Sequence, residues 1–159
     1  MAILPIAKVG NPILRQLSKP VDPDVIGSRK FQEFLDDMFE TMFHFEGIGL
    51  AAPQIARSEQ VVVMECQGTD ALPRTVLINP KIIFYGPSQC EMWEGCLSID
   101  NMRGKVVRPS MVRVQALDRK GVLQDIEANG LYAVCIQHEM DHLLGKLFID
   151  RMAYLSTLT

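Results

Sequence analysis

The residues best suited to chemistry lie in residues 137–143, which read QHEMDHL. His138 and His142 stand four apart, and four residues are close to one turn of an α-helix, so both imidazoles would point to the same face. Two imidazole nitrogens placed in this way can bind one metal ion. Glu139 would lie beside that face, near enough to move a proton of a metal-activated water without binding the ion itself. This run therefore predicts metal-assisted hydrolysis.

The same spacing also arises without any site, because a His-x-x-x-His pair occurs by chance and single histidines are commonly structural or solvated. His44 is the third histidine of the chain and stands alone near the end of a predicted helix. A cation suits the helix dipole there, and we expect no site role for His44. Spacing alone leaves both interpretations of His138 and His142 open.

A catalytic metal usually takes three protein ligands and keeps a further position open for water or substrate. Only 17 residues follow His142. The one acidic residue among them, Asp150, is too close in sequence to the two histidines for its side chain to turn back easily to the same metal ion. We therefore expect the third ligand upstream. Cys96 in the segment 94–98 is the best candidate, because its thiolate is a soft ligand and Gly95 lets the backbone bend closely around a site.

Cys135 is a competing thiol for the same ligand position. It lies three residues before His138, so a helix would bring it toward the same face, and spacing does not exclude it. For Cys66 and Cys90 we expect small apolar fillers or inert thiols. Four cysteines in a chain of this size, without a secretion signal, indicate thiols in a reducing compartment and not a disulfide framework.

Hydrophobic periodicity indicates the elements that must position these residues. Over residues 24–45, apolar side chains recur at helical spacing with acidic side chains on the other side, which predicts an amphipathic helix. Gly47 is a natural stop for this helix, and the segment 47–54, with two glycines and Pro53, cannot continue it. Strands are then predicted over residues 60–65, 75–85, 105–107, 112–117 and 122–127.

A second helix is predicted over residues 131–144, after the break at Asn129-Gly130 and closed by Gly145. It carries the two spaced histidines, and we expect the strands to bury it. Strands followed by a helix, without regular alternation, predict an α+β fold. The expected fold has antiparallel or mixed β-sheets packed around a buried C-terminal helix with the HExxH motif, plus an N-terminal amphipathic helix.

Length and composition limit the class of protein. The chain has 159 residues, 48% of them apolar, which is enough for one core, so we expect a single domain over residues 1–159. A net charge of −3 and a pI near 5.6 argue against a nucleic-acid surface. No apolar stretch approaches the roughly 18 residues of a membrane span, and prolines and cations interrupt the N-terminal residues before a signal-peptide core. We expect a cytoplasmic protein with neither a membrane nor a nucleic-acid partner.

Three separated segments stand out together: GIGLAAPQ over residues 47–54, EGCLS over 94–98 and QHEMDHL over 137–143. They resemble the signature motifs of the peptide deformylase family. Their order and separations also look like those of the family, and the similarity runs over nearly the whole chain. One such motif would be weak evidence, whereas three in register are strong evidence for a bacterial-type deformylase.

The resemblance implies three metal ligands: Cys96, His138 and His142. It implies that Glu139 is the general acid and base of the reaction. It further implies that the Gln54 side chain and the backbone N–H of Leu97 stabilise the oxyanion. By the same resemblance, Cys135 lines the substrate pocket instead of binding the metal.

The reaction implied by the resemblance removes the formyl group from the N-terminal methionine of new polypeptides and releases formate. Gly47 and Gly49 would let an extended peptide approach the backbone and pair with it as an added strand. We expect an apolar wall for the methionine side chain, with Arg103 and Glu94 near the mouth of the pocket. The predicted substrate-binding residues are Gly47, Ile48, Gly49, Glu94, Gly95, Arg103, Leu131, Val134 and Cys135.

Thiolate and imidazole ligands suit both zinc and ferrous iron. The resemblance favours Fe2+, with Zn2+, Ni2+ or Co2+ able to occupy the site, and it implies N-formylmethionyl nascent peptides and a transient ribosome contact as partners. A metal-bound histidine usually donates its other N–H to a carboxylate or carbonyl. Asp141 is a candidate for this role, but we expect it to face away and pair with Arg103 or Arg108.

The sequence departs from the family pattern in three places. Asp100 stands where many members have proline, and Trp93 stands where smaller or charged residues are common. The chain stops soon after Asp150, whereas many bacterial members continue into a longer basic helix that helps them dock on the ribosome. This argues against that mode of docking and leaves the metal site unaffected.

Two other functions remain open from the sequence. A zinc endopeptidase would use the same helix with another third ligand, and Cys96 would then be dispensable. A non-catalytic deformylase-like domain would bind nascent chains or the ribosome, and it would hold metal without turnover. Glu139 and Gln54 argue against this second alternative, because a retired site has no need of them.

Overall fold

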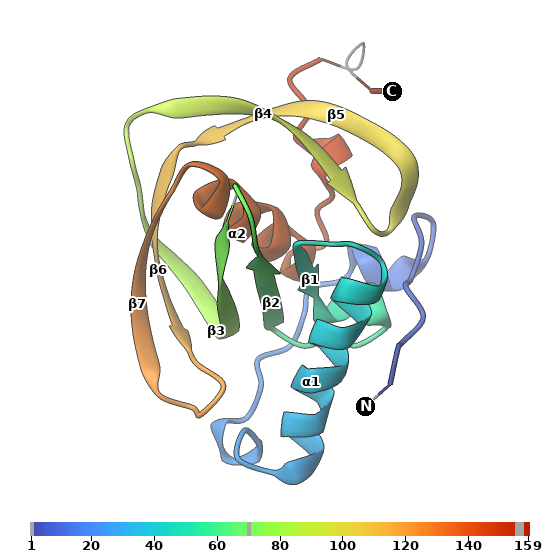
Figure 1. Ribbon diagram of the computed structural model, residues 1–159, viewed down its shortest axis with the longest axis vertical. Helices are drawn as coiled ribbons and strands as arrows, with labels where there is room; N and C mark the ends of the chain where they lie inside the picture. The colour runs from blue at the N-terminus through green and yellow to red at the C-terminus, as the bar shows by residue number, and fades with distance from the viewer. Residues whose placement is uncertain (1, 70, 155–157) are drawn as a thin grey trace.

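The computed structural model describes residues 2–69, 71–154 and 158–159, which form two α-helices and seven strands arranged in two antiparallel sheets (Figure 1). The larger sheet has the order β1-β2-β3-β6-β7: β1 (Gly49–Ala51), β2 (Val61–Cys66), β3 (Leu72–Tyr85), β6 (Met111–Leu117) and β7 (Leu123–Asn129). The smaller sheet pairs β4 (Gln89–Cys96) with β5 (Ile99–Pro109). The helices are α1 (Arg29–His44) and α2 (Gly130–Leu143).

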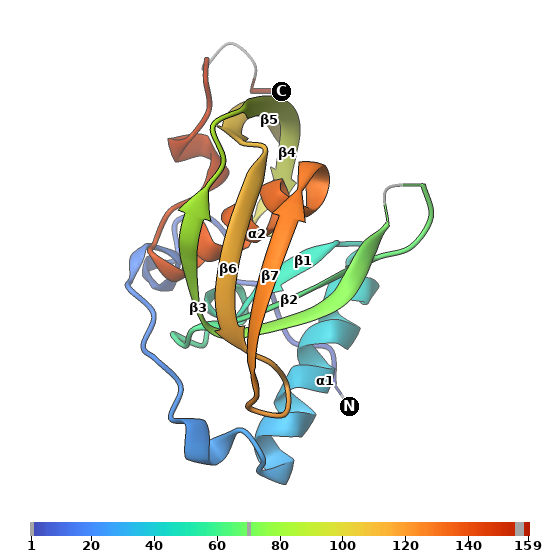
Figure 2. The same cartoon turned by 90° about the vertical axis from the view of Figure 1, so that its left-hand side faces the viewer.

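Helix α2 lies between the two sheets, where it packs against strands of the larger sheet and against β5 (Figures 1 and 2). Four short 3-10 turns complete the described elements: Pro12–Arg15, Pro23–Val25, Ala52–Ile55 and Phe148–Asp150. The predicted α+β fold with a buried helix carrying the HExxH motif is confirmed. No helix of the described residues is long and apolar enough to cross a membrane.

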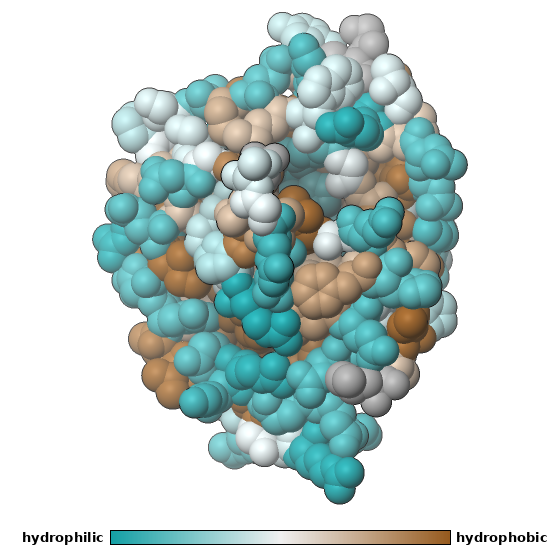
Figure 3. All heavy atoms as spheres, viewed as in Figure 1, coloured by the Kyte–Doolittle hydropathy of each residue, from teal (hydrophilic) through white to brown (hydrophobic). Residues whose placement is uncertain are grey.

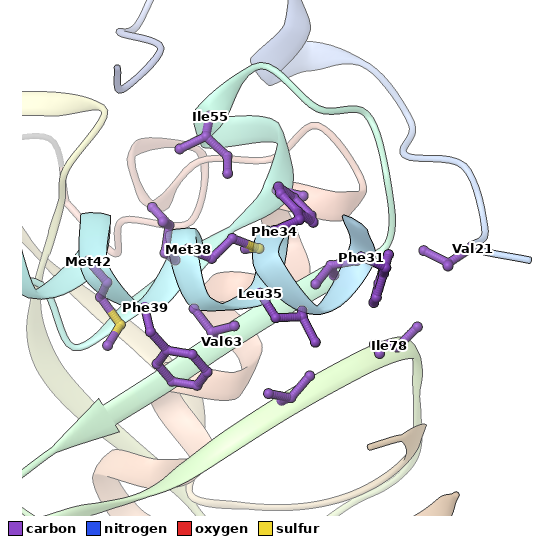
Figure 4. Close-up of a cluster of buried hydrophobic side chains, with 14 of the residues drawn as sticks. Val21, Phe31, Phe34, Leu35, Met38, Phe39, Met42, Ile55, Val63 and Ile78 are labelled. Carbon is purple, nitrogen blue, oxygen red and sulfur yellow. The ribbon is translucent and has the colours of Figure 1, made fainter. Parts of the chain in front are cut away.

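Strand β2 shows how the larger sheet separates two apolar cores. Successive side chains of a strand point to opposite faces, and β2 is apolar on both. Val61 and Val63 pack with the apolar face of α1, whereas Val62 and Met64 pack with α2. Figure 4 shows the first of these cores, in which Phe31, Phe34, Leu35, Met38, Phe39 and Met42 of α1 gather over the sheet.

Helix α1 begins later than the sequence pattern predicts. The predicted helix starts near residue 24, but Pro23–Val25 forms a separate 3-10 turn and the helix begins at Arg29. Ser28 is the N-cap, and its hydroxyl accepts a hydrogen bond from the Phe31 N–H at 3.2 Å. A serine cap of this kind satisfies a backbone donor that has no partner inside the helix. The cap therefore sets the start of α1.

Helix α2 ends as the sequence predicts, in a glycine with left-handed backbone. The N–H of Gly145 donates to the His142 carbonyl, and the N–H of Lys146 donates to the Asp141 carbonyl. This is the Schellman pattern, which satisfies the last carbonyls of a helix. Gly145 has φ +73°, and a Cβ on it would lie 2.6 Å from the backbone carbonyl of Arg15. The end of α2 is thus packed directly on the N-terminal part of the chain.

We expect Gly145→Ala to destabilise the protein. The left-handed conformation costs a residue with a Cβ roughly 1–2 kcal/mol, and the contact with the Arg15 backbone adds to this because backbone cannot move aside cheaply. Urea unfolding of the variant and the parent measures the difference. Gly27→Ala is the matched control, since a Cβ on Gly27 would meet nothing within 4 Å. Equal midpoints for the two variants would contradict the expectation.

The smaller sheet is the part of the fold that the sequence pattern predicts least well. Only residues 105–107 are predicted as strand, whereas β5 spans Ile99–Pro109 and β4 is not predicted at all. The reason is that this sheet is half-exposed, so its strands lack the continuous apolar run of β2. The pairing also breaks between Gly95↔Arg103 and Cys96↔Ile99. Residues 100–102 therefore form an unpaired bulge, called here the β5 bulge.

Candidate active site

A thiolate donor and two imidazoles meet between the end of β4 and helix α2. Cys96 is the last residue of β4, and His138 and His142 lie one turn apart on α2. One ligand atom from each of the three lies within 4.8 Å of the others, and Cys96 Sγ is 3.4 Å from His142 Nε2. Sulfur and nitrogen ligands of a tetrahedral zinc ion stand about 3.5 Å apart at normal bond lengths. The three donors therefore fit one divalent metal ion.

A buried chain of charges orients His138. Glu94 Oε1 accepts the Nδ1 proton of His138 at 2.8 Å, which fixes the tautomer and leaves Nε2 free for a metal. Arg108 donates to both carboxylate oxygens of Glu94, at 2.7 and 3.0 Å, and to Asp141 at 2.9 Å. Arg151 also donates to Asp141. Burial opposes ionisation of Glu94, but the hydrogen bonds from His138 and Arg108 outweigh it and lower its pKa.

The sequence identifies only part of this chain. The predicted pairing of Asp141 with an arginine is confirmed, with Arg108 as the partner. Glu94 lines the cavity above the site, but its carboxylate is buried and turned toward Arg108 and His138 instead of the mouth. The sequence does not predict the hydrogen bond between Glu94 and His138. Alternation along β4, with Trp93 exposed and Glu94 buried, is the signal that could have revealed it.

Glu139 lies beside the metal-ligand cluster and not within it. Its Oε1 is 3.9 Å from His138 Nε2, and its buried Oε2 has no hydrogen-bond partner among the described residues. Burial raises the pKa of Glu139 to about 7, although the charge of His138 acts in the opposite direction. A carboxyl with a pKa near neutrality is suited to both taking up and releasing a proton. Gly49 makes the room, since a Cβ there would stand 2.7 Å from Glu139 Oε1.

The two imidazoles have different electrostatic surroundings. Burial, together with the charge of His138, holds the pKa of His142 well below its usual value, so His142 offers a neutral nitrogen. Burial also acts to lower the pKa of His138, but hydrogen bonds to Cys96 and Glu94 outweigh it and raise this pKa well above the usual value. Metal binding requires a neutral imidazole, so a metal at His138 Nε2 competes with a proton for that nitrogen.

Gln54 reaches the cluster from the 3-10 turn that follows β1. Its Oε1 accepts a hydrogen bond from the Ala51 N–H at 2.9 Å, which fixes the orientation of the side-chain amide. Its Nε2 then faces Cys96 Sγ at 3.4 Å and Ser98 Oγ at 3.2 Å. The amide donor is thus held next to the thiol of the donor cluster.

A cavity of about 820 Å³ opens over this cluster, and Figure 3 shows the surface hollowed with apolar atoms beside it. Every residue predicted to bind substrate lines this cavity, together with Gln54, Cys96, Leu97, His138 and Glu139. The three sequence motifs, far apart in the chain, therefore meet around one space. This volume is typical of small-molecule and peptide sites.

The competing thiol also lies in this cavity, but on its wall. Cys135 lines the cavity and is not one of the three clustered donors among the described residues. Burial, reinforced by the charges of Glu139 and Glu94, raises its pKa well above the usual value, so it is an uncharged thiol. A Cys-His-His set of possible metal ligands and a buried glutamate beside a cavity are the groups that a metal-dependent hydrolase requires.

Comparison with known proteins also indicates a hydrolase, and it identifies the family of the chain. The family model described as "Polypeptide deformylase" matches residues 3–157, and the chain belongs to the peptide deformylase family. A peptide deformylase of Stutzerimonas stutzeri is 48% identical over 158 residues, covering 99% of this chain and 90% of the relative. That of Leptospira biflexa is 42% identical over 159 residues, covering 96% of this chain and 89% of the relative.

Solved structures agree with the sequence relatives. The Met-Ala-Ser-bound class I type b peptide deformylase from Acinetobacter baumannii matches with a TM-score of 0.92 at 35% identity, over 95% of this chain and 99% of that one. The Thermotoga maritima peptide deformylase matches with a TM-score of 0.87 at 33% identity, over 97% and 100%. The chain is a metal-dependent enzyme that removes the formyl group from N-terminal formylmethionine of new polypeptides. The predicted function is confirmed, and neither alternative function has support among these relatives.

Proposed function

We propose that Cys96, His138 and His142 hold the catalytic metal of this deformylase and that Glu139 moves the proton. The observation that carries the proposal is the convergence, within 4.8 Å, of one thiol from β4 and two imidazoles from α2 beside the cavity that Cys96 and His138 line. The Glu94 hydrogen bond supports it, because it turns His138 Nε2 toward the other two donors.

A divalent metal held by these ligands would polarise the formyl oxygen and lower the pKa of an attacking water toward about 7. Glu139 takes the proton of this water as its oxygen bonds to the formyl carbon. The same carboxyl then delivers the proton to the nitrogen as the carbon–nitrogen bond breaks, giving formate and a free amine. This use of one carboxyl twice is consistent with its position next to the cluster and its unpartnered oxygen.

Charge develops on the formyl oxygen during the attack, and two donors are near it. The Gln54 amide is oriented by Ala51 so that its Nε2 faces the cluster. The Leu97 N–H directly follows the cysteine ligand, and Leu97 lines the cavity. One donor of this kind contributes about 3 kcal/mol of transition-state stabilisation. We assign both to the oxyanion.

The peptide part of the substrate would lie between two unpaired strand edges. Among the described residues, β1 is an edge strand of the larger sheet and β4 pairs only with β5, so one side of each could take an added strand. Residues before and within β1 and residues within β4 line the cavity. The methionine side chain would pack against the wall made by Ile48, Leu131, Val134 and Cys135. The Met-Ala-Ser-bound relative supports this use of the cavity.

We further propose ferrous iron as the metal, action in the cytoplasm where nascent chains are made, and a transient contact with the ribosome. The iron proposal is supported by the donor set, because thiolate and imidazole suit Fe2+ as well as Zn2+. Anaerobic reconstitution of metal-free protein with Fe2+, Zn2+, Ni2+ or Co2+, followed by hydrolysis of formyl-Met-Ala-Ser, tests the choice. The ion that gives the highest turnover per bound metal identifies the working cofactor.

Two serine variants test the ligand set. We expect Cys96→Ser to lose metal and deformylase activity together, because a hydroxyl is a far poorer ligand than a thiolate. Cys135→Ser should keep its metal, because Cys135 lies outside the three-donor cluster. Metal content after gel filtration and formyl-Met-Ala-Ser hydrolysis under anaerobic conditions measure both effects. Full metal content in Cys96→Ser, with loss in Cys135→Ser, would show that the wrong thiol has been assigned.

A further inference from the structure

The β5 bulge borders the mouth of the substrate cavity. Asn101 and Met102 of the bulge and the adjoining Arg103 line the cavity, and Asn101 has φ +57°. A non-glycine residue with a left-handed backbone is uncommon and persists only where the surrounding structure holds it. What holds the bulge therefore controls the shape of the cavity mouth.

The last two residues of the chain hold one end of the bulge. Thr159 and Arg103 exchange both backbone hydrogen bonds, Arg103 N–H to the Thr159 carbonyl at 2.8 Å and Thr159 N–H to the Arg103 carbonyl at 2.9 Å. This is the pattern of a hydrogen-bonded antiparallel pair. Figures 1 and 2 both place this part of the chain beside β5. Thr159 itself lines the cavity.

Leu158 and, separately, Met152 make apolar contacts with β5 and the residues packed on it. Leu158 packs against a small core made by Ile99, Val106, Leu147 and Phe148. Met152 pairs with Val106 and lies so close to Gly104 that a Cβ there would stand 2.4 Å from its sulfur. The free edge of β5 is thus covered at several points, and the Thr159–Arg103 pair is the contact nearest the cavity.

The other end of the bulge has its own contact. Lys8 Nζ donates to Asp100 at 2.8 Å and to the Leu97 carbonyl at 2.9 Å. Both side chains of this ion pair are well exposed, so it contributes little by itself. The bulge is thus restrained at both ends, by the Lys8–Asp100 pair at one end and by the Arg103–Thr159 backbone pair at the other.

We propose that Leu158 and Thr159 form a positioning segment that holds the β5 bulge and Arg103 at the cavity mouth, and thereby sets the affinity for substrate residues that follow the methionine. This rests on the proposed function. There, the methionine side chain packs against the wall made by Ile48, Leu131, Val134 and Cys135, and the substrate residues that follow it extend toward the mouth of the cavity. Substrate binding loses less conformational entropy when the residues at the cavity mouth are already ordered than when the substrate must order them.

A proline at the last position isolates the backbone pair. Thr159→Pro removes the backbone N–H that donates to the Arg103 carbonyl. Thr159→Ala removes the threonine hydroxyl and methyl groups but keeps that N–H. The substrates are formylmethionine amide, which ends before the mouth, and formyl-Met-Ala-Ser, which reaches it. For Thr159→Pro we expect KM for the tripeptide to rise roughly three- to tenfold, the worth of one hydrogen bond. Its kcat, and KM for the amide, should stay within about twofold of the parent.

The outcomes separate this inference from the proposed function. A parent-like ratio of the two KM values in Thr159→Pro, or the same shift in Thr159→Ala, would overturn the positioning role. An equal loss of kcat on both substrates would also overturn it, because that is the signature of general damage to the fold. Leu158→Asp provides a second test by releasing the apolar anchor, and the same change in KM ratio is expected. If the parent hydrolyses neither substrate, the proposed function fails as well.

Discussion

Replacing Glu139 with glutamine is expected to lower kcat for formyl-Met-Ala-Ser by about 10²–10⁴-fold, the usual contribution of a general acid and base. Glutamine has nearly the same shape, so it fits the tight space beside Gly49, but it cannot take up the proton of water or deliver one to the amine. Because Glu139 lies beside the Cys96, His138 and His142 cluster and not within it, the metal should be retained. Steady-state kinetics and metal analysis on the same preparation measure both quantities.

The matched control for this change is Glu127→Gln, since Glu127 is an exposed glutamate on β7, away from the cavity. It should keep the parent's activity and metal content. Glu139→Gln with parent-like turnover would refute the proton-transfer role. Loss of metal in step with activity would instead place Glu139 among the ligands and contradict its assignment.

Arg108→Met is expected to reduce the free energy of unfolding by about 3–5 kcal/mol, the typical cost of removing one partner from a buried ion pair. Arg108 is only 5% exposed, and its guanidinium binds Glu94 in a bidentate manner and also binds Asp141. Methionine has a similar length but no charge, so Glu94 would be left buried with His138 as its remaining partner. Urea denaturation of metal-free parent and variant measures the loss without a contribution from bound metal.

A surface ion pair provides the comparison for Arg108. Arg113 binds Asp125 at 2.9 Å with both side chains over two-fifths exposed, so Arg113→Met should cost only about 0–1 kcal/mol. Adding Glu94→Gln to Arg108→Met should recover part of the stability, because the stranded charge is then removed. A cost for Arg108→Met no larger than that for Arg113→Met would show that the buried chain of charges does not stabilise the fold.

The sequence predicts the elements of the fold where burial is strong and regular. β2 is apolar on both faces, and α1 has a clear apolar stripe, so both are found from periodicity. The start of α1 is predicted several residues too early, because the Ser28 cap outweighs the apolar pattern that precedes it. β4 is missed because a half-exposed strand of a two-stranded sheet has no apolar run to detect. Its pairing with β5 depends on tertiary contacts that local patterns do not contain.

The site likewise contains some residues that local sequence spacing places and others that only tertiary contacts place. The spacing of His138 and His142 is local to one helix, so the sequence places both on one face. Cys96 and Cys135 could not be separated by spacing, and the resemblance to deformylases favoured Cys96, the thiol that the structure brings to the histidines. The hydrogen bond from His138 to Glu94 joins residues 44 apart. A contact of that kind is set by how β4 crosses α2.

The position of α2 in the sequence, after all seven strands, has a consequence for biosynthesis. Domains generally begin to fold from the N-terminal side while synthesis continues, so Cys96 would leave the ribosome well before either histidine. The metal-ligand set cannot close until the last helix has been made and has entered the space between the sheets. A deformylase of this fold thus cannot close its proposed metal-ligand set until its own α2 has been translated.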